Sequence, residues 1–170
     1  MKKIGLILIG VLLLLAATYG IFMWLEGNTS ITLQVVDAAP DHLVGKTFKG
    51  IPQDEKLEET FQSLETFRSL HPGTYLHTIY YQEPAGKLDT MEVFVGINLP
   101  YATQGMESRS FDESRYLRAI IQGNKWVMPN PERIKEKIRA FASQEGFTLS
   151  EVFVEKIISE SEVQVIAPVK

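Results

Sequence analysis

The sequence predicts an α+β domain in which a strand-helix-strand-strand module occurs twice, preceded by one transmembrane helix. Three observations predict it: an uncharged apolar run covers residues 4–25, two amphipathic helical patterns follow at a distance from each other, and short β-branched segments surround both. Such a duplicated module is expected to form an antiparallel sheet with two helices on one face and a central cleft. The 170 residues suffice for one ordinary domain plus an appendage.

The apolar run makes residues 1–25 a candidate membrane anchor. As a helix, residues 4–25 would extend about 33 Å, which is enough to cross the hydrocarbon core of a bilayer. A cleaved signal peptide is the alternative, because Lys2 and Lys3 precede the run. An uncleaved anchor is favoured, since the run is longer than the usual apolar region of a signal peptide and Trp24 suits a membrane interface. The two lysines predict a cytoplasmic N-terminus and an extracytoplasmic domain at the cell membrane; after signal cleavage the domain would instead be secreted.

Residues 26–30 read as a linker and residues 31–170 as the domain. Only two of the 17 basic residues and none of the 21 acidic ones precede residue 26, so the remainder carries a net charge of −6. This charge argues against a nucleic-acid partner. The chain contains no Cys, which excludes disulfides, a thiol nucleophile and a lipidated cysteine. The three His residues form no ligand pattern, so neither a metal nor another cofactor is expected.

The first half of the domain is expected to contain strands at 31–36 and 42–48, followed by a helix. The helix is predicted by apolar residues spaced by four and three, and it ends before His71-Pro72-Gly73. Strands at 75–81 and 91–99 follow, joined by a loop that contains proline and glycine. They form a natural antiparallel pair. The apolar residues of the helical pattern are Leu57, Phe61, Leu64 and Phe67.

The second half repeats this order. Strands are expected at 108–111 and 116–121, and the next helix has clear end signals, with Asn130 as N-cap, Pro131 at its first position and Gly146 after its end. Two more strands, 149–156 and 162–169, close the chain. Glu-Val-x-Val occurs at 92–95 and again at 162–165, each time followed soon by a proline, which indicates an internal duplication with a period of roughly 70 residues.

Acidic and aromatic residues alternate on the central strands. Alternation places Val93, Val95 and Ile97 against the helices, and it places acidic and aromatic side chains on the opposite face, where we expect the cleft. Carboxylates among aromatic rings suit a lipophilic or cationic ligand, through burial and cation–π contact. A solvated polar sheet face is the alternative for any single Glu. The candidate ligand-binding residues are Tyr80, Tyr81, Glu92, Phe94, Trp126, Glu151, Phe153 and Glu155.

The chain resembles the effector-binding domains of the GyrI-like superfamily, which also occur at the end of AraC-type and MerR-type regulators. The order and spacing of segments 79–84, 92–97, 150–155 and 162–169 carry this resemblance. It implies binding of small, often hydrophobic or cationic compounds in the cleft, with Glu151 facing the ligand, or Glu155 if the register differs. Because an apolar run stands where a helix-turn-helix would, we expect no role in transcription.

Two other function classes stay open at this stage. Some GyrI-like proteins are hydrolases, so the resemblance also allows an enzyme in which Glu151 is the general base and Tyr80 or Tyr81 orients the substrate. A nucleophilic triad has no support, because neither Cys nor Gly-x-Ser-x-Gly occurs. A membrane-tethered interaction domain for an envelope protein is the third class, with the acidic segment 54–59 as its contact face. We favour ligand binding over catalysis.

Overall fold

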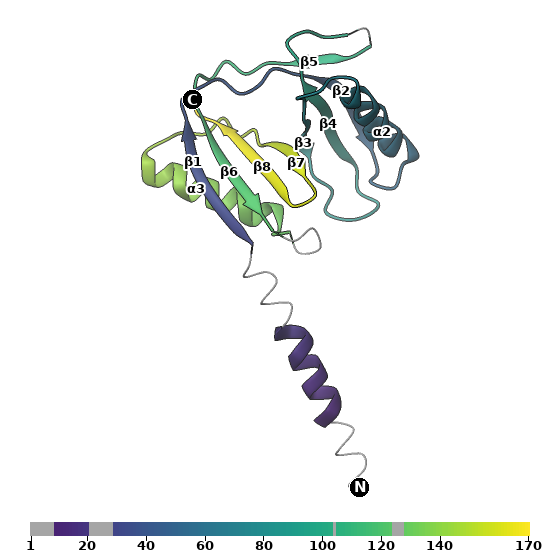
Figure 1. Cartoon of the computed structure of the whole chain (residues 1–170), viewed down its shortest axis with the longest axis vertical. Helices are drawn as coiled ribbons and strands as arrows, with labels where there is room; N and C mark the ends of the chain where they lie inside the picture. The colour runs from purple at the N-terminus through teal and green to yellow at the C-terminus, as the bar shows by residue number, and fades with distance from the viewer. Residues whose placement is uncertain (1–8, 21–28, 104, 124–127) are drawn as a thin grey trace.

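The computed structural model describes residues 9–20, 29–103, 105–123 and 128–170. The domain is built on one antiparallel sheet of eight strands, in the order β1-β6-β8-β7-β3-β4-β2-β5 (Figure 1). Two helices, α2 (Glu55–Ser69) and α3 (Pro131–Glu145), pack on it. The strands are β1 (Ser30–Val36), β2 (Leu43–Gly50), β3 (Leu76–Gln82), β4 (Met91–Asn98), β5 (Glu107–Arg109), β6 (Tyr116–Gln122), β7 (Val154–Ser159) and β8 (Glu162–Pro168).

The sheet has the duplicated architecture that the sequence predicts. The chain order β2-α2-β3-β4 of the first half recurs as β6-α3-β7-β8 in the second half. In the sheet, the trio β2-β4-β3 meets the trio β7-β8-β6 where β3 pairs with β7, so the two halves are related by a pseudo-two-fold axis at that junction. The remaining strands, β1 and β5, flank the two ends.

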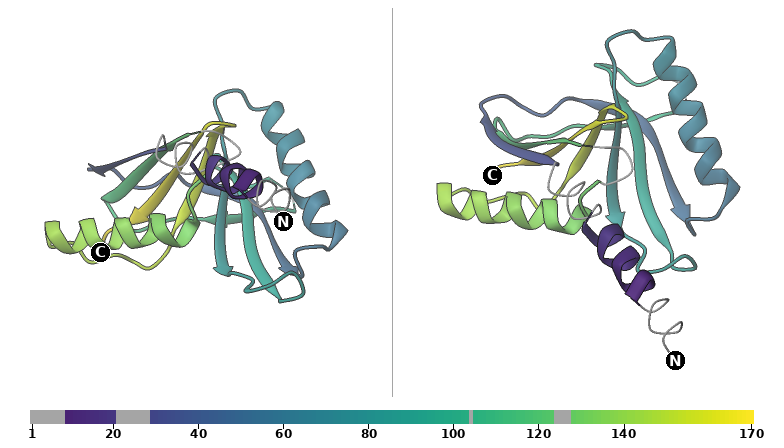
Figure 2. Two further views of the ribbon diagram at one scale, coloured as in Figure 1. Left: turned by 90° about the horizontal axis from the view of Figure 1, so that it is seen from below. Right: turned by 60° about the horizontal axis from the view of Figure 1, so that its bottom comes forward.

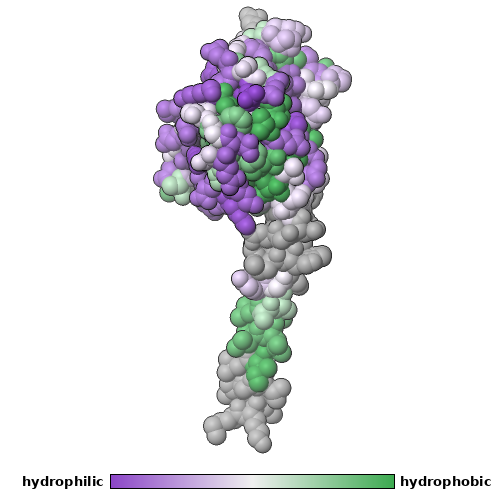
Figure 3. Space-filling view, turned by 90° about the vertical axis from the view of Figure 1, so that its left-hand side faces the viewer, coloured by the Kyte–Doolittle hydropathy of each residue, from purple (hydrophilic) through white to green (hydrophobic). Residues whose placement is uncertain are grey.

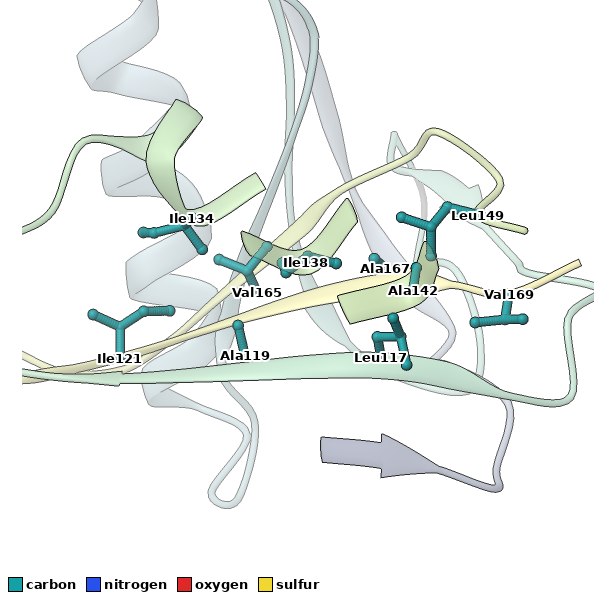
Figure 4. Close-up of a cluster of buried hydrophobic side chains, with 10 residues drawn as sticks. All are labelled: Leu117, Ala119, Ile121, Ile134, Ile138, Ala142, Leu149, Val165, Ala167 and Val169. Atoms are coloured by element: carbon teal, nitrogen blue, oxygen red, sulfur yellow. The ribbon is translucent and has the colours of Figure 1, made fainter. Parts of the chain in front are cut away.

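Both helices lie on the same face of the sheet, as expected. Each packs on its own half, which Figure 2 shows as two separate helices beside two groups of strands. Strand register proves the common face, because Val95 of the α2 core is opposite Thr78, Thr78 is opposite Glu155, and Glu155 is opposite Val165 of the α3 core. In the α3 core, Ile134 and Ile138 pack over residues of β6 and β8 (Figure 4).

The helix-free face carries a third hydrophobic core, where the sequence led us to expect the cleft. That expectation is wrong. Five buried side chains from five strands pack together there, and partly buried Phe111, Tyr116 and Val152 pack against them. The ring of Phe94 also lies over Gly96, where an added Cβ would come within 2.7 Å of the ring. The five buried residues are Leu43, Ile79, Phe94, Val154 and Ile166.

Strand β7 begins later than the predicted strand at 149–156. Glu151 has a φ of 63°, in the left-handed region that interrupts an extended strand, and Leu149 forms only an isolated bridge with Val169. Continuous alternation therefore does not extend across residues 149–153. Within β7, Val154 packs in the helix-free core.

Residues 9–20 are helical (Figure 1). Within the described residues, no helix combines the length and the apolar character needed to cross a membrane. The other parts of the expected span, residues 4–8 and 21–25 including Trp24, lie outside the described residues. Most of the expected linker, residues 26–28, also lies outside them.

Candidate functional site

The cleft lies on the helix-bearing face, between α2 and α3 and over the β3–β7 junction. It consists of two cavities that share Tyr80, Glu83 and Glu155. The first has a volume of ≈ 390 Å³ and a largely apolar wall, and the second has a volume of ≈ 220 Å³ and a more polar wall. The first is also lined by Pro52, Leu57, Pro84, Met91 and Pro131, and the second by Tyr81, Lys135, Arg139, Glu151 and Phe153.

Glu155 of β7 lies at the floor of both cavities. Thr78, opposite it on β3 and only 2% exposed, donates a hydrogen bond from Oγ1 to Oε2 of Glu155 at 3.1 Å. Burial raises the pKa of Glu155, and the charge of Glu83 adds to this, while the Thr78 hydrogen bond and the charge of Lys135 oppose it. The result is a carboxyl group that accepts a proton more readily than an exposed Glu does.

The two tyrosines occupy different positions at the cleft. Tyr80 shares the face of Thr78 and borders both cavities, and burial followed by the charges of Glu155 and Glu83 raises the pKa of its phenol. Its hydroxyl is therefore protonated and can donate a hydrogen bond. Tyr81 lies at a β-bulge between Tyr80 and Gln82, and its hydroxyl accepts a hydrogen bond from Nε of Arg109 at 3.0 Å. Tyr81 thus belongs to the rim.

Two cationic side chains of α3, Lys135 and Arg139, line the second cavity. Lys135 forms ion pairs with Glu83, which follows β3, and with Glu132 at 3.0 Å. Burial would lower the pKa of Lys135, but its hydrogen bonds to the two carboxylates outweigh burial and raise it. Lys135 lies 5.8 Å and Arg139 5.1 Å from the ring centroid of Phe153. The Lys135–Glu83 ion pair thus connects the two halves of the domain across the cleft.

Five of the predicted site residues lie together in the second cavity, although this cavity is on the helix-bearing face and the sequence predicted a cleft on the opposite face. They are Tyr80, Tyr81, Glu151, Phe153 and Glu155. Glu151 is at the rim, with a largely exposed side chain that lies 3.8 Å from Arg139. Of the two candidate acids, Glu155 is the more buried.

The structure does not bring the other predicted residues into the cleft. Phe94 is fully buried in the helix-free core, because strand alternation directs it away from both helices. Glu92 shares that orientation and forms an ion pair with Lys49 at 2.9 Å. The prediction that these two line the cleft is therefore corrected. Trp126 lies outside the described residues.

Sequence reasoning missed Thr78, Glu83 and Lys135. Two of these residues had a signal in the sequence. Thr78 precedes Tyr80 by two positions on one strand and so shares its face, and Lys135 is one helical turn after Pro131. No pattern could pair Lys135 with Glu83, because 52 positions separate them in the chain. Among the described residues, no cluster of three His, Asp or Glu side chains could hold a metal ion.

Comparisons with known proteins bear on the fold alone. The sequence matches no family model, and it matches none of the curated proteins. The structure is similar to a hydrolase from Listeria innocua, with a TM-score of 0.60 and 9% identity over 82% of this chain and 92% of that one. It is also similar to an uncharacterized conserved protein from the same organism, with a TM-score of 0.59, 11% identity and the same two coverages. An integron cassette protein from Vibrio cholerae has a TM-score of 0.50 and 8% identity, over 84% of this chain and 99% of that one. The chain therefore has a fold found in other bacterial proteins, some of them described as hydrolases.

Proposed function

We propose that the cleft binds a small lipophilic molecule that carries a positive charge. The observation that carries this proposal is Glu155, a half-buried carboxylate at the floor of a mainly apolar cavity. Among the described residues, its hydrogen-bond partner is the neutral Thr78, and Lys135 acts on it through charge alone. A cationic ligand would supply the positive charge that the protein itself does not place against this carboxylate.

The wall of the first cavity supports the same ligand class. Its acidic residues are Glu83 and Glu155, and no Lys or Arg is among its lining residues. Leu57, Met91 and three prolines offer apolar surface, and Tyr80 offers an aromatic ring. A volume of ≈ 390 Å³ is in the range of pockets that bury small organic ligands. Charge, apolar burial and ring contact thus all favour a lipophilic cation.

Replacing Glu155 with glutamine tests this proposal. We expect binding of a lipophilic cationic probe, benzyltriethylammonium, to weaken by about 10–100-fold, because the quaternary ammonium loses its charge attraction to the carboxylate. In the absence of probe, the thermal midpoint should rise, since an amide costs less to bury than a carboxylate. Calorimetric titration and thermal unfolding measure the two effects.

Glu92→Gln is the matched control, because it makes the same chemical change on the opposite face of the sheet. It should leave binding of the probe unchanged. Equal binding by wild type and Glu155→Gln would contradict the proposal.

A hydrolase is the second candidate function. A carboxyl group with a raised pKa is suited to act as general base near neutral pH, and Tyr80 is close enough to Glu155 for their charges to interact. Two of the similar structures are described as hydrolases. Ester turnover that disappears in Glu155→Gln while probe binding survives would favour this reading.

We propose that the apolar segment 4–25 holds the domain at the outer side of the cell membrane. It contains no charged residue and follows two lysines. The full chain should remain with membranes after extraction at alkaline pH, and protease added to spheroplasts should remove the domain. Leu14→Arg, which places a charge in the middle of the run, should release a substantial fraction. Recovery of wild type in the soluble fraction, or protection of the domain from protease, would contradict the proposal.

A further inference from the structure

The two ends of the sheet differ in how far they are protected against pairing with another strand. Strand β5 has three residues, two of which, Glu107 and Arg109, form an ion pair at 2.5 Å. Strand β1 has seven residues, SITLQVV, with neither a charge nor a proline, and it pairs with β6 over its whole length with no bulge. Natural sheets usually protect their edges by shortness, charge, proline or bulges. Edge β5 has such protection, whereas β1 has none.

Strand β1 offers both main-chain groups and apolar side chains. It is the last strand of the sheet, and no described strand pairs with its outer side. Ile31, Leu33 and Val35 share the helix-bearing face, because they are opposite Ile121, Ala119 and Leu117 of the α3 core. Val35 is 38% exposed. Figure 3, seen from the side where β1 and α3 lie in Figure 1, shows an apolar patch on the domain among hydrophilic side chains.

We propose that β1 pairs with β1 of a second copy of this chain, antiparallel and centred on Leu33. In this register Leu33 is opposite its own copy, Ile31 is opposite Val35, and Thr32 is opposite Gln34. Apolar residues then meet apolar residues on the helix-bearing face, and the polar residues Thr32 and Gln34 meet on the other face. The edge is thus self-complementary, as a two-fold interface requires.

The rest of the molecule permits this dimer. The domain carries a net charge of −6, but none of that charge lies on β1, so pairing does not bring acidic side chains together at the edge. The cleft lies at β3 and β7, which β6 and β8 separate from β1, and it stays open in the dimer. A two-fold axis normal to the sheet puts both Ser30 ends at the same level along that axis.

A single introduced cysteine tests the register, because the chain has no other. Facing residues of an antiparallel pair have Cα atoms about 4.5–5.5 Å apart, within reach of a disulfide. The full chain with Leu33→Cys, in detergent under mild oxidation, should therefore form a covalent dimer. Two controls should not: in Ser30→Cys the two copies lie roughly 20 Å apart along the strands, and Ser108→Cys lies on β5.

Charge variants provide a second readout that needs no cysteine. Thr32 and Gln34 are both exposed, so they can be changed without opening the core. Thr32→Lys with Gln34→Lys places like charges opposite each other twice, and Thr32→Lys with Gln34→Glu places opposite charges there. We expect the first variant to dissociate at about 10-fold higher protein concentration than the second, by light scattering.

Three results would overturn the proposal: a monomeric mass of the wild type, equal cross-linking of the three cysteine variants, or equal dissociation of the two charge variants. Pairing of β1 with an extended segment of a different protein would give the first of these. None of the three depends on ligand binding in the cleft, so the dimer and the proposed function can fail separately.

Discussion

Replacing Phe94 with alanine is expected to lower the free energy of unfolding by about 3–5 kcal/mol and to leave the affinity of the cleft for a ligand unchanged. Phe94 is fully buried in the helix-free core, where its ring contacts Gly96 and lies 5.0 Å from the guanidinium of Arg109. Truncation leaves a cavity that the β-sheet backbone cannot close. Because the ring points away from the helices, no wall of the cleft changes.

Denaturant unfolding of the two proteins measures the difference, and titration of the folded fraction with benzyltriethylammonium measures the affinity. Phe153→Ala is the matched control, because it removes the same side chain from the cleft wall. It should have the opposite profile, with weaker binding and a smaller loss of stability, since Phe153 is half-buried. A stable Phe94→Ala protein that no longer binds the probe would show that the sequence-based assignment of Phe94 to the cleft is right after all.

The helices and the duplication could be predicted from the sequence because their signals are local. Asn130, Pro131 and Gly146 mark the ends of α3, and the structure has a hydrogen bond from the backbone N–H of Glu132 to the Asn130 side chain and a left-handed Gly146. Alternation on β4 is equally local, and it correctly directed Val93 and Val95 to the helices.

The position of the cleft could not be predicted in this way. Alternation divides a strand into two faces, but it does not tell which face the remaining chain covers. The helix-free face is covered by side chains such as Phe111 and Val152, which the sequence assigned to strands but which lie outside the strands of the structure. The helix-bearing face is open over Tyr80 and Glu155, because each helix covers only its own half. The cleft is thus a consequence of the spacing between two helices.

The choice between Glu151 and Glu155 depended on one backbone torsion. In a continuous extended strand the two carboxylates would lie on the same face, because four positions separate them, and both would be equally good candidates for the acid of the cleft. The positive φ of Glu151 leaves its side chain largely exposed beside Arg139, while Glu155 is held in β7 against Thr78. A residue other than glycine in the left-handed region carries no clear sequence signal, so sequence reasoning could only leave the alternative open.

Lowering the pH from 6.5 to 4 is expected to remove about 3 kcal/mol of stability through His77 alone. His77 is fully buried on β3, its Nδ1–H donates to the carbonyl of Tyr75 at 2.9 Å, and its Nε2 has no hydrogen-bond partner in the part of the chain that the structure describes. Burial, reinforced by the charge of Lys156 and opposed by the Tyr75 carbonyl and Asp41, lowers the pKa of His77 from 6.5 to about 4. The folded state therefore excludes a proton that the unfolded chain takes up below pH 6.5.

His77→Asn isolates this effect, because its amide can donate to the same carbonyl but does not titrate. The stability conferred by neutral His77 is complete above pH 6.5 and disappears as the pH falls towards 4, so the wild type should lose more stability in this window than the variant does. The raised pKa of Glu155 has the opposite sign and is common to both proteins, so it cancels in the comparison. Denaturant unfolding at several pH values measures the slopes, and an NMR titration of the wild type measures the pKa directly. Parallel slopes in wild type and His77→Asn, or an imidazole that titrates near 6.5, would contradict the assignment of acid sensitivity to His77.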